Sequence, residues 1–168
     1  MSRQPTGRLL RNRLGEIDLL LDRTFPAPIK DVWASLTESP RLERWIGRWE
    51  GDAGPGRTVA FTMTAEGSTT PEDVLIQECD EPRRLVVNFN PGDEAWRISL
   101  ALTESDGVTT LTFAMALSES QDPSDIGPGW EYYLDRLVAD YAGEPMAEWD
   151  VYYPAQKDFY AAAVAAIR

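Results

Sequence analysis

Histidine is absent from this sequence, so carboxylates, one thiol and aromatic rings carry its chemical possibilities. A Ser-His-Asp triad, a Cys-His pair and a histidine metal site are all excluded, together with the commonest general base near neutral pH. The single cysteine, Cys79, has no partner for a disulfide and no histidine to activate it as a nucleophile. We therefore predict no catalytic residue, no metal site and no cofactor.

Two pairs of carboxylates lie close enough in the sequence to act together. Glu72 and Asp73 enter a predicted strand, and Glu131 and Asp135 lie one turn apart on a predicted helix. A buried carboxylate with a raised pKa can serve as an acid or a base. Because acidic residues are spread along the chain at polar positions, we interpret both pairs as parts of a solvated surface.

Aromatic residues form the other candidate set. They can wall a pocket that stacks on a flat or apolar ligand, or they can simply fill a core. Trp33 and Phe113 are interpreted as core, and Trp130 and Tyr133 as pocket residues. The whole set is Trp33, Trp45, Trp49, Phe61, Phe89, Trp96, Phe113, Trp130 and Tyr133. Two polar strand residues, Asn88 and Arg97, are predicted by alternation to face outward.

The charge distribution argues against nucleic acid as a partner. The net charge is −12, and the four arginines among the first fourteen residues precede the first acid, Glu16. The remaining chain carries 12 basic and 28 acidic residues, a net charge of −16, which repels phosphate backbones. We expect the basic arm, residues 1–15, to be a mobile, solvated terminus.

The elements that must position these side chains are mostly strands. Apolar and polar residues alternate in series between short turns, which predicts antiparallel neighbours with one apolar face. The predicted strands are 17–25, a short one at Trp49, and 58–64, 74–77, 85–89, 96–103 and 110–117. Two short helices, 29–36 and 40–45, follow the first strand. One amphipathic helix, 129–141, follows a loop that contains Pro123 and Pro128.

The length of 168 residues suits one domain. The start of the chain has no long apolar run, so we expect a cytoplasmic protein without a membrane span. The economical architecture is an α+β fold in which an antiparallel sheet of about six to seven strands wraps around the long helix. We divide the chain into the arm 1–15, a domain 16–143, and an aromatic and alanine-rich tail 144–168 that ends in a helix.

A series of short motifs accompanies this order of elements. They are Arg23-Thr24-Phe25-Pro26-Ala27-Pro28, Val32-Trp33-Ala34, Leu36-Thr37, Pro40, Leu42, Trp45, Gly54-Pro55-Gly56, Glu81-Pro82-Arg83-Arg84-Leu85, Thr109-Thr110-Leu111-Thr112, Gly129-Trp130, Leu134 and Leu137. Together the motifs and the elements resemble the START-like helix-grip superfamily, also called SRPBCC. Within it the chain is similar to the single-domain bacterial family named for the activator of the heat-shock protein 90 ATPase. The resemblance covers roughly residues 16–143.

The resemblance implies a cavity between the sheet and the last helix, and relatives bind lipids, hormones or polyketides there. Our first hypothesis is non-catalytic binding of a small apolar or aromatic ligand. The predicted pocket residues are Trp45, Phe61, Met63, Val87, Phe89, Ile98, Leu100, Trp130, Tyr133, Leu134 and Leu137. Burial of apolar ligand surface at roughly 25 cal/mol per Å² would supply the affinity.

Two alternatives stay open. An interaction module could use the acidic surface to dock on a chaperone-type ATPase, as the resemblance implies. A polyketide cyclase-like or hydratase-like enzyme is the other. The enzyme is disfavoured because many relatives carry a histidine near the end of the last strand, where this chain has Met115-Ala116-Leu117. The tail could form a homodimer surface or fold back on the domain, and the sequence favours neither.

Overall fold

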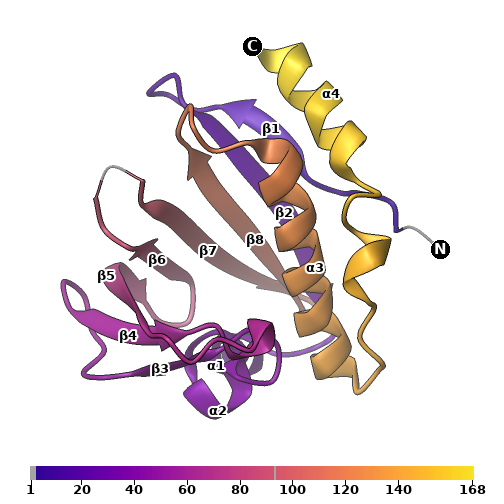
Figure 1. The fold of residues 1–168 in the computed structure, drawn as a ribbon. Coiled ribbons are helices and arrows are strands. Elements are labelled where there is room, and N and C mark those ends of the chain that lie inside the picture. The colour runs from indigo at the N-terminus through magenta and orange to yellow at the C-terminus, as the bar shows by residue number, and fades with distance from the viewer. Residues whose placement is uncertain (1–2, 93) are drawn as a thin grey trace.

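Apolar alternation produces one curved antiparallel sheet with a long helix across its concave face (Figure 1). The computed structural model describes residues 3–92 and 94–168, and within these residues the sheet has eight strands in the order β1-β2-β8-β7-β6-β5-β4-β3. The strands are β1 (Arg8–Arg11), β2 (Ile17–Phe25), β3 (Arg48–Glu50), β4 (Thr58–Thr62), β5 (Glu72–Asp80), β6 (Arg84–Phe89), β7 (Trp96–Ser105) and β8 (Val108–Leu117). The predicted α+β class is confirmed, with slightly more strands than expected.

The register explains why one face of the sheet is apolar. Leu21 pairs with Phe113 of β8, which in turn pairs with Leu100 of β7, so the three side chains share a face. Leu19 and Met115 form the next row and have no exposed surface. A slip of one residue would turn these apolar side chains toward water, so the pattern fixes the register.

The β7–β8 hairpin has the tight turn that its sequence predicts. Asp106 and Gly107 connect the strands with φ of 52° and 77°, and Ser105 pairs with Val108. Positive φ at both central residues suits the right-handed twist of a hairpin, and Asp-Gly is a preferred pair for it. This turn holds Leu100 and Phe113 in register on the concave face.

Two short helices carry the chain from β2 to the far edge of the sheet. Pro28 precedes α1 (Ile29–Thr37), which buries Val32, Trp33 and Leu36. The one-turn helix α2 (Ser39–Leu42) follows, and β3 then pairs with β4 at the edge. Both helices lie beside that edge at the bottom of Figure 1, where they close one end of the concave face.

The long helix α3 (Pro123–Ala142) begins six residues before the predicted start. The predicted loop through Pro123 and Pro128 is therefore wrong. Asp122 caps the helix by accepting the Ser124 amide, and Pro123 occupies the first turn, where it needs no N–H partner. Pro128, which suggests a loop in the sequence, lies inside the helix. The six added residues bring Asp125 and Ile126 onto the helix beside the sheet.

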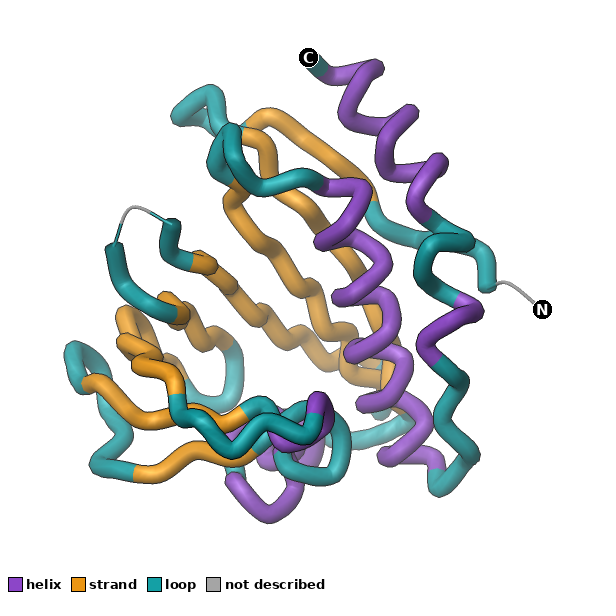
Figure 2. The backbone as a smooth tube through the Cα atoms, viewed as in Figure 1, coloured by secondary structure: helices purple, strands orange, loops and turns teal. Residues whose placement is uncertain are grey.

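The arm and the tail pack against each other and against α3. The arm, which we expected to be mobile and solvated, is mostly exposed, but it contains β1, which pairs with β2. The tail forms a short 3₁₀ helix, η2 (Trp149–Val151), and α4 (Lys157–Ile167), which contacts α3 and β1. Figure 2 shows α4 beyond α3, on the side of β1. Tyr152 and Tyr160 are at most 1% exposed, so the tail folds back on the domain.

No helix within the described residues is long and apolar enough to span a membrane.

Candidate functional site

Two cavities lie between the concave face of the sheet and α3. The larger, which we call the wide chamber, has a volume of about 730 Å³. It lies where β5 begins, β6 ends and β7 begins, and the first half of α3, the 3₁₀ helix η1 (Thr64–Glu66) and η2 complete its wall. Its lining residues are Met63, Ala65, Glu66, Glu72, Phe89, Asn90, Trp96, Ile98, Asp125, Ile126, Gly129, Trp130, Tyr132, Tyr133 and Trp149.

The second cavity, the narrow chamber, has a volume of about 170 Å³ and is almost entirely apolar. Leu36, Leu42 and Trp45 of the α1–α2 region form one side of it. Strands β4 to β8 and α3 form the rest, through Val59, Phe61, Val74, Ile76, Cys79, Leu85, Val87, Phe89, Ile98, Leu100, Phe113, Trp130 and Leu134, with Thr37, Ile46, Trp49, Ala53 and Gly54 at the edge.

Three side chains line both chambers: Phe89, Ile98 and Trp130. The Trp130 ring lies 4.6 Å from Phe113, 6.1 Å from Tyr133 and 6.4 Å from Trp96, measured between ring centres. Its indole N–H is buried and has no hydrogen-bond partner among the described residues. A buried donor without an acceptor costs free energy.

All predicted pocket residues except Leu137 line at least one of the two chambers. Met63 and Tyr133 line the wide chamber, and Trp45, Phe61, Val87, Leu100 and Leu134 line the narrow one. Leu137 lines neither and is part of the closed core, with no exposed surface. Both polar strand residues lie on the outer face as predicted, because Asn88 pairs with the exposed Arg97, although Asn88 itself is only 9% exposed.

A tyrosine–carboxylate pair stands on the wall of the wide chamber. The Tyr133 hydroxyl donates a 2.6 Å hydrogen bond to Glu66. Burial and the acceptor carboxylate both raise the pKa of Tyr133 well above its ordinary value. The phenol therefore stays protonated at neutral pH, where it can orient a ligand but cannot act as a base.

The thiol of Cys79 is also unsuited to nucleophilic chemistry. Partial burial raises its pKa, and the nearby carboxylates of Glu81 and Asp80 raise it further. Thiolate is the reactive form, so this thiol is poorly reactive at neutral pH. Among residues 3–92 and 94–168, no three His, Cys, Asp or Glu side chains gather as a metal site requires.

The pair Glu131 and Asp135 contradicts our interpretation of a solvated surface. Glu131 is 1% exposed, and both acids accept hydrogen bonds from Arg23, at 2.7 Å and 2.9 Å. Glu131 also accepts bonds from the Thr6 and Gly7 amides and the Tyr160 hydroxyl. Tyr152 donates a 2.7 Å bond to Asp135. This cluster joins arm, β2, α3 and tail, and lies away from both chambers.

The environment of Glu131 favours its charged form. Burial alone would raise the pKa of Glu131, but hydrogen bonds from Tyr160 and the Thr6 amide, together with Arg23, lower it below its ordinary value. Its hydrogen bonds come from the arm, from β2 and from the tail. We therefore assign the cluster a structural role, holding the two ends of the chain against α3.

Some residues of the wide chamber lie where the sequence indicates no site. Asp125 and Ile126 fall in the predicted loop, and Trp149 falls in the predicted aromatic tail. Tyr132 lies on the flank of α3, where its ring contacts Tyr133 and Trp149 edge to face, each at 5.1 Å. The tail thus contributes to the chamber wall, and the local periodicity of the tail carries no signal of that contact.

The comparisons with known proteins agree with this architecture. The family model described as activator of Hsp90 ATPase homolog 1-like protein matches residues 26–141. The chain belongs to this family. The arm lies outside the matched residues, as does Trp149 in the chamber wall. No curated protein is significantly similar to the chain.

Solved structures confirm the helix-grip fold. CalU16 from Micromonospora echinospora is 24% identical, with 98% of this chain and 99% of that chain covered and a TM-score of 0.75. The BPP1335 protein from Bordetella parapertussis is 21% identical, with 96% and 94% covered and a TM-score of 0.72. DynU16, from the dynemicin biosynthetic locus, is 20% identical over 78% of this chain and 49% of that chain, with a TM-score of 0.66. At these identities the likeness concerns the fold alone.

Proposed function

We propose that this protein binds a small apolar or aromatic ligand, without transforming it, between the sheet and α3. The two adjacent chambers are the observation that carries the proposal. Their combined size is in the range of small-molecule sites, and their walls combine many apolar groups with few polar ones. Each 100 Å² of apolar ligand surface removed from water would contribute about 2.5 kcal/mol.

The chemistry of the walls favours binding over catalysis. Tyr133 remains protonated, and the buried acid Glu131 lies away from both chambers and is held by Arg23 and Tyr160. A general acid or base works best with a pKa near the operating pH. Of the structural relatives, DynU16 belongs to a biosynthetic locus, that of dynemicin. A product of biosynthetic chemistry, such as an aromatic natural product, is therefore one ligand class worth testing.

Native mass spectrometry of the purified protein, followed by denaturing extraction, is the first test. We expect a co-purifying apolar species, or thermal shifts from a panel of lipids and aromatic compounds. Leu100→Phe should reduce the space in the narrow chamber and weaken binding of its occupant about tenfold, without lowering the melting temperature by more than a few degrees. Leu14→Phe is the matched control, because Leu14 is 82% exposed.

An apo mass, together with no thermal shift from any compound in the panel, would exclude this function.

A second candidate, docking on a chaperone-type ATPase, is favoured by the family of the chain. The net charge of −12 would steer the protein toward a basic partner, so the yield of a pull-down should fall steeply with salt. For either function we propose a cytoplasmic location, which is consistent with the exposed free thiol of Cys79.

A further inference from the structure

The wide chamber has carboxylates at its edge and no basic lining residue in the described chain. Glu66, Glu72 and Asp125 line it, and Glu66 and Asp125 are largely exposed, which places their charges at the mouth. A site for a fatty acid or another anion would need lysine or arginine here. The local charge and the net charge of −12 act in the same direction, because both attract cations and repel anions.

Two of these carboxylates have no cation paired with them among the described residues. Glu66 accepts from the neutral Tyr133 hydroxyl at 2.6 Å, and Glu72 accepts from the neutral Asn90 amide at 3.3 Å. Asp125 differs, because it pairs with Lys157 of α4. The mouth of the chamber therefore keeps two uncompensated negative charges.

Aromatic residues account for six of the fifteen residues that line the wide chamber. Ring faces are negative, so they attract an ammonium group, most strongly where water is partly excluded. Tyr133 is 8% and Trp130 is 9% exposed, so the deeper part of the wall is dry. The six rings are Phe89, Trp96, Trp130, Tyr132, Tyr133 and Trp149.

The chain already holds one ammonium group at this mouth in the same way. The Lys157 Nζ lies 5.5 Å from the centre of the Tyr153 ring and pairs with Asp125. Tyr153 in turn stacks on Trp149, with 5.6 Å between ring centres and 16° between planes. A carboxylate and an aromatic face thus bind a cation at the same chamber that the unpaired Glu66 and Glu72 line.

We propose that the wide chamber selects an organic ammonium ligand, with the cation at the mouth near Glu66 and Glu72 and its aromatic or apolar body among the rings. This inference rests on the proposed function and names the ligand class for the same site. A ligand with a further apolar substituent would direct it past Phe89 and Trp130 toward the narrow chamber.

Three probes with one ring system and different charge test the inference by isothermal titration calorimetry. They are 1-naphthylmethylamine, which is cationic at pH 7, the neutral 1-naphthalenemethanol, and the anionic 1-naphthoate. We expect the amine to bind about tenfold more tightly than the alcohol and the acid to bind most weakly. In the double variant Glu66→Gln, Glu72→Gln the amine and the alcohol should bind within about twofold of each other.

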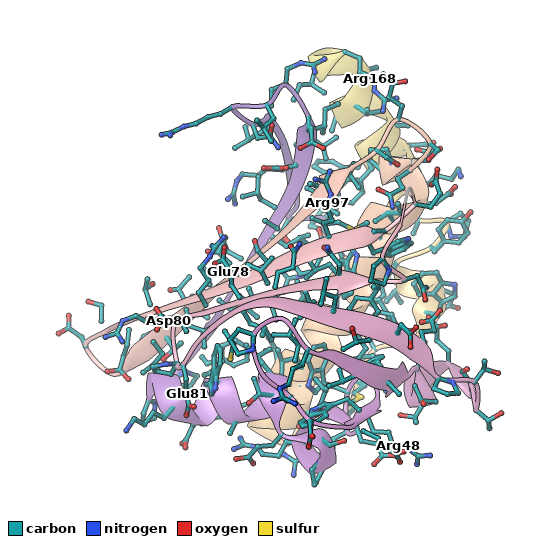
Figure 3. All side chains as sticks on the ribbon, turned by 90° about the vertical axis from the view of Figure 1, so that its left-hand side faces the viewer. Arg48, Glu78, Asp80, Glu81, Arg97 and Arg168 are labelled. Carbon is teal, nitrogen blue, oxygen red and sulfur yellow. The ribbon has the colours of Figure 1, made fainter. Side chains whose placement is uncertain are left out.

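The matched control removes two charges elsewhere. Glu78→Gln with Glu81→Gln changes the net charge equally, at the β5–β6 hairpin (Figure 3), the end of β5 opposite Glu72, and neither residue lines a chamber. This variant should keep the full preference for the amine. If the alcohol or the acid binds the wild type as tightly as the amine, the inference is wrong and the proposed function stands. If none of the three probes and no apolar compound of the panel binds, both fail together.

Discussion

At Glu131, one buried carboxylate accepts hydrogen bonds from residues far away in the sequence. Thr6 and Gly7 precede it by more than 120 positions, and Tyr160 follows it by 29. The partners of a buried charge must be present together, because a charge left alone in a dry site is very costly. Both ends of the chain are thereby tied to one side chain of α3.

We expect Glu131→Gln to destabilise the protein by about 3 kcal/mol, near the lower end for a broken buried ion pair, because Arg23 keeps Asp135 as a partner. Urea unfolding measures the change. Glu119→Gln, at an exposed position, is the control and should change stability by less than about 0.5 kcal/mol. Equal effects of the two substitutions would mean that the cluster does not hold the ends of the chain.

The burial of Glu131 could not be predicted from the sequence, because residues distant in the chain cover it. Glu131 and Asp135 have the spacing of an exposed helix face, and the cover over that face comes from the arm and the tail. Helical periodicity describes only one element at a time. Tyr133 and Trp130, by contrast, face the sheet of their own domain, so their position next to a cavity followed from periodicity and the expected fold.

At the scale of elements, α4 docks on α3 through close contact of one ring with two glycines. A Cβ atom added at Gly127 would lie 2.7 Å from three ring carbons of Tyr160, and one added at Gly7 would lie 2.1 Å from its hydroxyl oxygen. Both contacts are shorter than side chains allow. The absence of side chains at these positions lets the ring reach Glu131.

This contact predicts that Gly127→Ala changes stability in opposite directions in the wild type and in a Tyr160→Ala background. Glycine to alanine in a helix normally stabilises by up to about 1 kcal/mol. Gly127→Ala should instead destabilise the wild type by about 1–3 kcal/mol, because the added methyl group displaces the Tyr160 ring. In a Tyr160→Ala background the same substitution should be stabilising. Urea unfolding of the four proteins gives the comparison.

Gly129→Ala is the control on the same helix, because a Cβ atom there has no neighbour within 4 Å. It should stabilise in both backgrounds. If Gly127→Ala stabilises the wild type as Gly129→Ala does, α4 does not pack on α3 as described.

Most strands could be predicted because each carries its own alternation, and short turns such as Asp106-Gly107 fix antiparallel pairing. Strand β1 could not, because Arg8–Arg11 has only two apolar residues and pairs along the sheet edge. The start of α3 is obscured because Pro128 and two glycines mimic a loop. The cap at Asp122 with Pro123 is the signal in the sequence for the true start.

At the scale of the whole molecule, two opposing electrostatic effects set the dependence of stability on pH. The net charge is −12 at pH 7 and the isoelectric point is about 4.4, so self-repulsion falls as the pH is lowered toward 5. At lower pH, the protonation of specific carboxylates determines how stability changes. The pKa of Glu131 lies below its ordinary value despite burial, because its hydrogen bonds and Arg23 favour the charged form. For Asp22, burial acts upward but hydrogen bonds from Thr112 and Arg8 lower its pKa.

A carboxyl group with a lowered pKa in the folded state stabilises above the pKa of the unfolded chain, and this contribution is lost as the pH falls through the folded pKa. Stability should therefore hold or rise from pH 7 to about 5, and fall below about 4. Urea unfolding from pH 3 to 8 should show that the gap between the wild type and Glu131→Gln, largest at neutral pH, narrows in acid. If the difference in stability between the two proteins stays constant with pH, protonation of Glu131 does not cause the loss of stability in acid. Asp22 would then be the group to replace next.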